Sequence, residues 1–338
     1  MAGEGHDESN NTRRGDPTVE VQERGEIFFF FRPKVGKEEA QGLDDVQRFY
    51  IVLRPESGKK DVEVKQESSS GKEGEELGAR TSDNKPTREI TSEKRDESRV
   101  EGGRGCEEIN IGKQQLLRLI VMGKKGLPDP TKNSGDRRPH WGFVEMVTTK
   151  TEDVRAALKG KEYDTSTRGH RRVGPARAAG EGVYLILRHN PGKKMHTHLV
   201  YKLELPAEED ERNEPQEELN IKREDSFLIQ IKNPEQSQGG GDGRMSSGLQ
   251  RKRRAVYPAH LQAEMGQLRY TPADPPDFLN YEGCEFLLIP ASDNIGEELG
   301  PDIKSEVDAD GAHNCSDLIG NSFRETATIT PLLKGTWA

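Results

Sequence analysis

Cysteine is scarce in this chain of 338 residues, which contains only Cys106, Cys284 and Cys315, and long hydrophobic runs are absent. The odd number and wide spacing of the cysteines argue against a disulfide framework and against a compact cysteine-ligated metal site. No apolar stretch approaches the roughly 20 residues that cross a bilayer. The first 30 residues lack the basic start and apolar stretch of a signal peptide. We therefore expect a soluble protein of the cytoplasm, the nucleus or both, without membrane contacts.

Local signatures of catalysis are also missing. The sequence contains no GxSxG, HExxH, CxxC or kinase pattern, and neither a GxxxxGK[ST] nor a GxGxxG nucleotide-binding loop. Catalytic pairs can assemble in space without such signatures, so the question of an enzyme stays open, with no cofactor identified. The net charge of −9 mixes both signs and provides no general positive field, which argues against nucleic acid as a partner.

Hydrophobic residues make up 30% of the chain and charged residues 33%. Segments without apolar clusters cannot offset the entropy lost on ordering, so we predict one β-rich domain at 25–299 with disordered, charged arms and inserts. Such segments suit binding to protein partners. The predicted disordered segments are 1–24, about 56–108, 207–218 and 235–248, and the acidic tail 300–338.

Eight segments carry strand signals, because they are short, rich in aromatic and β-branched residues, and end at Gly, Pro, Asn or Asp. Short helices are expected at Thr151–Leu158 and Tyr257–Gly266. The intervals between strands do not hold the regular helices that parallel crossovers require. We predict a mainly β fold (α+β at most), a single antiparallel barrel or sandwich. The expected strands are Glu26–Arg32, Arg48–Arg54, Leu116–Met122, Trp141–Thr148, Val183–His189, Met195–Leu205, Ser226–Lys232 and Glu285–Pro290.

The stretch "GEIFFFFRPKV", at 25–35, places four phenylalanines in a row. Side chains alternate between the two faces of a strand, so a sheet with one wet face would bury only two of these rings. An unbroken apolar run predicts a central strand that is covered on both faces, by the core on one side and by a helix or loop on the other.

A hairpin is predicted in "VYLILRHNPGKKMHTHLVYKLEL". With a turn at Asn190–Lys194, His189 lies opposite Met195 and Leu187 lies opposite Thr197. This register gives one continuous apolar face and places Arg188 opposite His196 on the other face.

Several stretches together resemble a family of uncharacterised plant proteins with relatives in bacteria. They are "FFFFRPKVGKEEA", "DDVQRFYIVLRPESG", "HWGFVEMVT", "YDTSTRG", "GEGVYLILRH", "HTHLVYKLELP", "QIKNPE" and "PADPPDFLNYEGCEFLLI". The resemblance spans 28–299, with the charged inserts interrupting it. It implies no activity, ligand or catalytic residue, because the family has no established function.

Two patterns raise the question of a bound cation. His196 and His198 share one face of a strand at a spacing that metals use, as in cupins, but no third ligand is identified and the framing glycines of cupins are missing. The tail segment 306–317, "EVDADGAHNCSD", resembles a calcium loop. Its end residues distort that pattern. An outward polar face and an acidic solvated tail are the favoured interpretations, and neither a metal nor calcium is the leading expectation.

The segment 165–182, "TSTRGHRRVGPARAAGEG", is the one ordered-looking basic loop in an acidic chain. Arginines among glycines suit a phosphate or carboxylate, and this loop leads directly into the predicted hairpin. If it folds back along the strand, one anion site would combine it with the far end of the hairpin, near His196 and His198. The alternative is a solvated loop that pairs with acidic segments. The candidate anion-binding residues are Arg168, Arg171, Arg172, Arg177 and Arg188.

The basic tetrad Arg251, Lys252, Arg253 and Arg254 follows a Gly-rich stretch and is a candidate nuclear import signal. Such tetrads also arise by chance in a chain with 51 basic residues.

Two functions fit these patterns. The leading hypothesis is a non-catalytic β-rich interaction or scaffold protein that binds partners through its charged segments. The alternative is a small-anion binder or an enzyme that uses the arginine loop and the hairpin face.

Overall fold

The computed structural model describes residues 18–56, 59–63, 106–111, 113–129, 140–167, 169–190, 194–206, 213–236, 254–291 and 330–337 of the chain.

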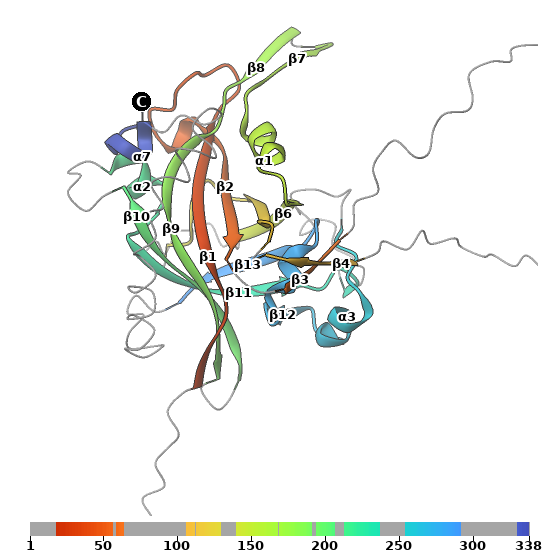
Figure 1. Cartoon of the computed structure of the whole chain (residues 1–338). Coiled ribbons are helices and arrows are strands. Elements are labelled where there is room, and N and C mark those ends of the chain that lie inside the picture. The colour runs from red at the N-terminus through yellow and green to blue at the C-terminus, as the bar shows by residue number, and fades with distance from the viewer. Residues whose placement is uncertain are drawn as a thin grey trace, which may run out of the picture.

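Eight antiparallel strands form a closed barrel (Figure 1). They are β1 (Thr18–Pro33), β2 (Val46–Pro55), β5 (Leu117–Met122), β6 (His140–Thr148), β9 (Arg177–Asn190), β10 (His196–Leu205), β11 (Glu224–Lys232) and β13 (Glu285–Pro290). The order around the barrel is β10-β9-β1-β2-β5-β6-β13-β11, and the pairing of β10 with β11 closes the ring. A short strand, β12 (Tyr270–Pro272), pairs with the end of β11.

The predicted fold class is confirmed, and the structure decides between its two forms in favour of the barrel. Each of the eight predicted strand segments corresponds to one barrel strand. Of the two predicted helices, α1 (Thr151–Leu158) has the predicted bounds, and α3 (Ala259–Met265) is shorter than predicted.

The four phenylalanines of β1 divide between two hydrophobic cores. Phe29 and Phe31 point into the barrel, while Phe28 and Phe30 point outward and pack in a cluster with residues of α1. All four rings are buried. The prediction of a strand covered on both faces is therefore confirmed.

Aromatic rings from four strands fill the middle of the barrel. The Phe29 ring stacks on Phe49 of β2, with 6.1 Å between ring centroids, and meets the edge of Tyr201 of β10 at 5.1 Å. Tyr201 in turn stacks on Phe227 of β11 at 6.2 Å. Because these rings reach one another across the barrel, its middle is a packed core.

A buried ion pair lies inside the barrel between β5 and β1. Both Nη atoms of Arg118 donate to the two carboxylate oxygens of Glu23, at 2.5 and 3.0 Å, and its Nε donates to Oδ1 of Asn280 at 2.8 Å. The hydroxyl of Tyr184 donates to Glu23 at 2.8 Å. The neighbouring Glu23 carboxylate raises the pKa of the Arg118 guanidinium, so the pair stays ionised although it is buried.

The predicted register of the β9–β10 hairpin is wrong by one residue. His189 lies opposite His196 and Leu187 lies opposite His198, so Arg188 faces Thr197 instead of His196. Large apolar side chains occupy both faces of this hairpin, with Leu185 outside and Ile186 inside. Alternation fixes a register only where one face is polar, and here it could not distinguish the two.

Parts of the predicted disordered segments form regular structure. Residues 18–24 belong to β1, the β3–β4 hairpin lies largely within 56–108, and the short helices α2 and α7 lie within 207–218 and 300–338. The β7–β8 hairpin forms in the segment that the sequence predicts to be an ordered basic loop. These elements contain few apolar residues, so the sequence carries only a weak signal for them. Their bounds are β3 (Lys59–Glu63), β4 (Cys106–Asn110), β7 (Lys161–Thr165), β8 (Gly169–Val173), α2 (Glu214–Glu218) and α7 (Thr330–Lys334). The 3₁₀ helices are η1 (Leu43–Asp45) and η3 (Pro276–Asn280).

Candidate functional site

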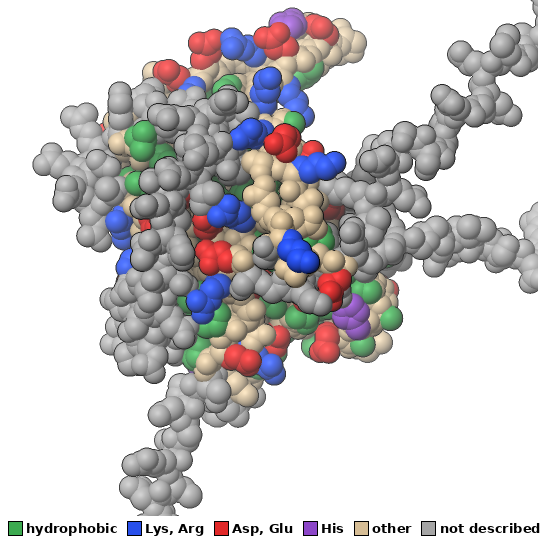
Figure 2. Space-filling view, viewed as in Figure 1, with side chains coloured by type: hydrophobic (Ala, Val, Ile, Leu, Met, Phe, Trp, Pro, Cys, Tyr) green, Lys and Arg blue, Asp and Glu red, His purple; other side chains and the backbone are tan. Residues whose placement is uncertain are grey.

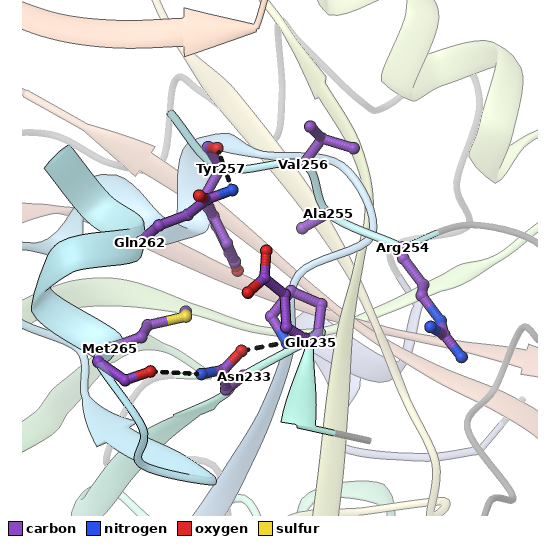
Figure 3. Close-up of a pocket in the computed structure, with 10 residues that line it drawn as sticks. Asn233, Glu235, Arg254, Ala255, Val256, Tyr257, Gln262 and Met265 are labelled. Atoms are coloured by element: carbon purple, nitrogen blue, oxygen red, sulfur yellow. Dashed lines mark hydrogen bonds between the residues drawn. The ribbon is translucent and has the colours of Figure 1, made fainter. Parts of the chain in front are cut away.

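A pocket of about 240 Å³ opens beside α3, where β11 leaves the barrel (Figure 3). Three stretches form it: the turn after β11 and, about 20 residues later in the sequence, two contiguous stretches, the segment that leads into α3 and α3 itself. We call it the α3 pocket. Its lining residues are Asn233, Pro234, Glu235, Arg254, Ala255, Val256, Tyr257, Gln262, Met265 and Gly266.

The buried amide of Asn233 holds two walls of the α3 pocket together. Its Nδ2 donates to the carbonyl of Leu268 at 3.0 Å, just beyond α3, and its Oδ1 accepts from the backbone N–H of Glu235 at 3.0 Å. Gln262 on α3 donates from Nε2 to the carbonyl of Tyr257 at 2.9 Å, as Figure 3 shows. Because these bonds link all three stretches, the pocket is pre-formed.

The floor of the α3 pocket is continuous with the barrel core. Tyr257 and Met265 are buried members of the inner hydrophobic cluster. The ring of Tyr257 meets Phe278 and Tyr281 edge-on, each at 5.3 Å between centroids. Contacts with these two buried rings hold Tyr257 in place at the floor of the pocket.

A glycine allows the backbone before β13 to pack closely against the pocket segment at Ala255. Gly283 has a φ of +91°, and a Cβ there would lie 2.7 Å from the backbone N of Ala255. The next residue, Cys284, is a buried free thiol beside Tyr257. Burial raises its pKa to about 12, so it is protonated and a poor nucleophile at neutral pH.

The rim of the α3 pocket carries one charge of each sign. Arg254 and Glu235 are both exposed, and in the described part of the chain neither side chain makes an ion pair. Val256 beside them is 52% exposed and adds an apolar group to the rim. In Figure 3 the guanidinium of Arg254 points away from the other lining residues. The pocket thus offers an apolar floor with separate positive and negative groups at its edge.

The predicted anion-binding arginines are largely engaged by acidic or backbone groups. Arg172 of β8 forms an ion pair with Glu38 at 2.9 Å, and Arg177 donates to the carbonyl of Glu38. Arg171 is half-buried on the β7–β8 hairpin, and Arg168 lies outside the described residues. Figure 2 shows acidic and basic side chains next to one another on this projecting hairpin. The loop therefore presents mixed charge.

The structure does not join the arginine loop to the far end of the β9–β10 hairpin. Arg177 and Arg188 lie at opposite ends of one continuous strand, about 36 Å apart at about 3.3 Å per residue. Arg188 forms an ion pair with Asp274 at 3.3 Å. The β7–β8 hairpin projects beyond the upper end of the barrel in Figure 1 and leads into the start of β9, whereas Arg188 lies near the end of that strand. A single anion site with both sets of residues is not formed.

The predicted histidine pair lies on the outer face of β10 and gains a third histidine from β9. The ring centroids of His189 and His198 are 5.5 Å apart, and His198 Nδ1 lies 3.3 Å from the Ser226 hydroxyl. His196 is half-buried nearby. Among the described residues, no group of three His, Cys, Asp or Glu side chains is arranged to hold a metal. The geometry therefore gives no support to a metal at His196 and His198.

Two other sequence motifs fall mostly outside the described residues. These are the calcium-like segment 306–317 and Arg251, Lys252 and Arg253 of the basic tetrad. Only Arg254 is placed, at the α3 pocket. The sequence predicts the helix of this pocket but not the pocket itself, because its walls are about 20 residues apart with an insert between them.

Comparisons of the chain with protein-family models, with curated proteins and with solved structures yield no match. The resemblance to the plant family therefore stays a prediction. None of the helices within the described residues is long and apolar enough to span a membrane.

Proposed function

We propose that this protein is a protein-interaction module in which the closed barrel is a rigid scaffold and the α3 pocket receives a short segment of a partner. One observation carries the proposal. The α3 pocket is pre-formed over the buried rings of the core, and its rim charges, Arg254 and Glu235, are not used in ion pairs by the described part of the chain.

The shape of the α3 pocket favours one apolar side chain flanked by charged groups. A volume of about 240 Å³ accommodates a side chain of moderate size above Tyr257 and Met265. Arg254 can pair with a carboxylate of the segment and Glu235 with a lysine or arginine. An apolar anchor in a pocket that excludes water, with charges at the rim, is the usual arrangement of a protein-interaction hot spot.

Site-specific photo-crosslinking in cells tests this function. Val256→p-benzoyl-phenylalanine places the reactive group at the rim of the pocket, and Tyr163→p-benzoyl-phenylalanine places it on the β7–β8 hairpin, where Tyr163 is 42% exposed. We expect a defined crosslinked partner from position 256 alone. Arg254→Glu in the same chain should abolish it, whereas Arg269→Glu, an exposed charge outside the pocket lining, should not. The same products from both positions, or products unaffected by Arg254→Glu, would refute the proposal.

A further inference from the structure

Helix α7 lies at the upper rim of the barrel in Figure 1, far from α3. We call the segment 330–337 the C-terminal segment and its contact surface the rim seat. Trp337 is 5% exposed, and its ring meets the edge of Phe31, with 5.1 Å between centroids at an angle of 74°. Leu332 is 1% exposed and lies in the outer cluster with Phe30. One short segment therefore contributes an anchor to each of the two cores.

Two hydrogen bonds are made to backbone carbonyls of the C-terminal segment. Gln216 of α2 is buried, and its Nε2 donates both to the carbonyl of Pro331 at 3.1 Å and to the carbonyl of Ala179 on β9 at 2.7 Å. The backbone N–H of Glu214 donates to the carbonyl of Gly335 at 3.2 Å. Protein surfaces bind short peptides in this way, with pockets for a few anchoring side chains and hydrogen bonds to the peptide backbone between them.

The rim seat buries the polar indole nitrogen of Trp337. The indole Nε1 of Trp337 is buried and has no hydrogen-bond partner among the residues that the structure describes. In water this N–H would be hydrated, so docking loses that hydration and the packing must offset the loss. This cost favours a contact that can open, because the undocked state regains the lost hydrogen bond.

Release of the C-terminal segment would disrupt no strand of the barrel. The 39 residues 291–329 connect the last strand, β13, to the segment, and the segment takes no part in the described sheets. The segment of a second copy has the identical sequence and would fit the same rim seat, which is the condition for exchange of an element between copies.

We propose that the rim seat is a peptide-recognition site, which the chain's own C-terminal segment fills in cis and the same segment of a second copy fills in trans. Its ligand is a short peptide with a leucine and, five residues later, a tryptophan.

Fluorine NMR on the full chain tests this proposal. The chain has two tryptophans, Trp141 and Trp337, so 5-fluorotryptophan gives one signal from β6 and one from the rim seat. The probe is the free peptide TPLLKGTWA, which stands for the segment of a second copy. An intramolecular ligand can reach an effective concentration of about millimolar, so the peptide is added to several millimolar. We expect the Trp337 signal to move to the position of a solvent-exposed tryptophan, while the Trp141 signal stays unchanged as an internal control.

A second variant keeps the test decisive if the natural segment is held too tightly to exchange. The full chain with Trp337→Ala should bind fluorescein-labelled peptide at least tenfold more tightly than the wild type does. A peptide with Leu333→Ala should bind equally well, because Leu333 is 51% exposed, and a peptide with Trp337→Ala should not bind. If Trp337→Ala retains the circular dichroism of the wild type but binds no peptide at millimolar concentration, the proposal is overturned. If Trp337→Ala does not fold, an unmoved Trp337 signal in the wild type overturns it.

Discussion

Arg118 is a fully buried charge, and its partner Glu23 is nearly as buried. Removal of one partner leaves the other charge without its counter-ion inside the barrel. We therefore expect Arg118→Met to lower the free energy of unfolding by about 3–5 kcal/mol in urea denaturation. The double variant with Glu23→Met should recover most of this loss, because well-packed apolar side chains replace a buried pair at little cost.

An exposed ion pair is the matched control for Arg118. Arg172 and Glu38 are largely solvent-exposed, so Arg172→Ala should change the free energy of unfolding by less than about 1 kcal/mol. Equal effects of Arg118→Met and Arg172→Ala would contradict the assignment of Arg118 to the barrel interior.

His198 makes the protein sensitive to acid. Burial and the nearby imidazoles of His189 and His196 lower its pKa from 6.5 to about 4. The unfolded chain therefore takes up a proton at a higher pH than the folded chain. The contribution of His198 to the free energy of unfolding is therefore complete above pH 6.5. It is lost as the pH falls from about 6.5 to about 4, and the loss from this residue is at most about 3 kcal/mol.

Denaturation curves across this pH range check the role of His198. In His198→Leu the loss of stability between pH 6.5 and pH 4 should be smaller than in the wild type. His260 lies exposed on α3, and His260→Gln should keep the loss of the wild type. An unchanged pH dependence in His198→Leu would show that His198 is not buried in its neutral form.

At the scale of elements, the β3–β4 hairpin changes what can be removed from the long insert. The sequence alone suggests that 57–103 buries nothing, but β3 pairs with β4 and lies against η3. Glu63 and Cys106 are direct antiparallel partners, so an Asn-Gly turn can join them. We expect replacement of 64–105 by Asn-Gly to shift the midpoint of thermal unfolding by less than about 3 °C, because closure entropy changes slowly with loop length.

Deletion of 57–103 is the comparison for that prediction, since it removes β3 as well. It should lower the midpoint further than replacement of 64–105 does. If both changes have the same effect, the β3–β4 hairpin contributes nothing to stability.

At the scale of the whole molecule, side chains fill the middle of the barrel. Phe29 contacts rings of β2 and β10 at its centre, so Phe29→Ala removes contacts that join three strands. We expect it to lower the free energy of unfolding by about 3–5 kcal/mol in urea denaturation, as for other buried Phe→Ala changes. Tyr163→Ala, on the exposed β7–β8 hairpin, should stay within about 0.5 kcal/mol of the wild type. A small effect of Phe29→Ala would indicate a hollow barrel.

The local order of residues by itself determined the eight strands, helix α1 and the burial of four consecutive phenylalanines. Strand formation and two-sided burial follow from side-chain type and alternation within a few residues, so they can be predicted without the fold. The β7–β8 hairpin could not be predicted, because it has little hydrophobic signal. The register of β9–β10 could not be predicted either, because apolar residues lie on both faces of that hairpin.

Only the tertiary structure decided that the sheet closes, that Arg188 meets Asp274 and not the arginine loop, and that Trp337 returns to Phe31. The α3 pocket likewise exists only because Asn233 lies beside α3 in space. Each of these features joins residues from distant parts of the chain. Such contacts depend on how strands pair around the barrel, and no local pattern of residues records that pairing.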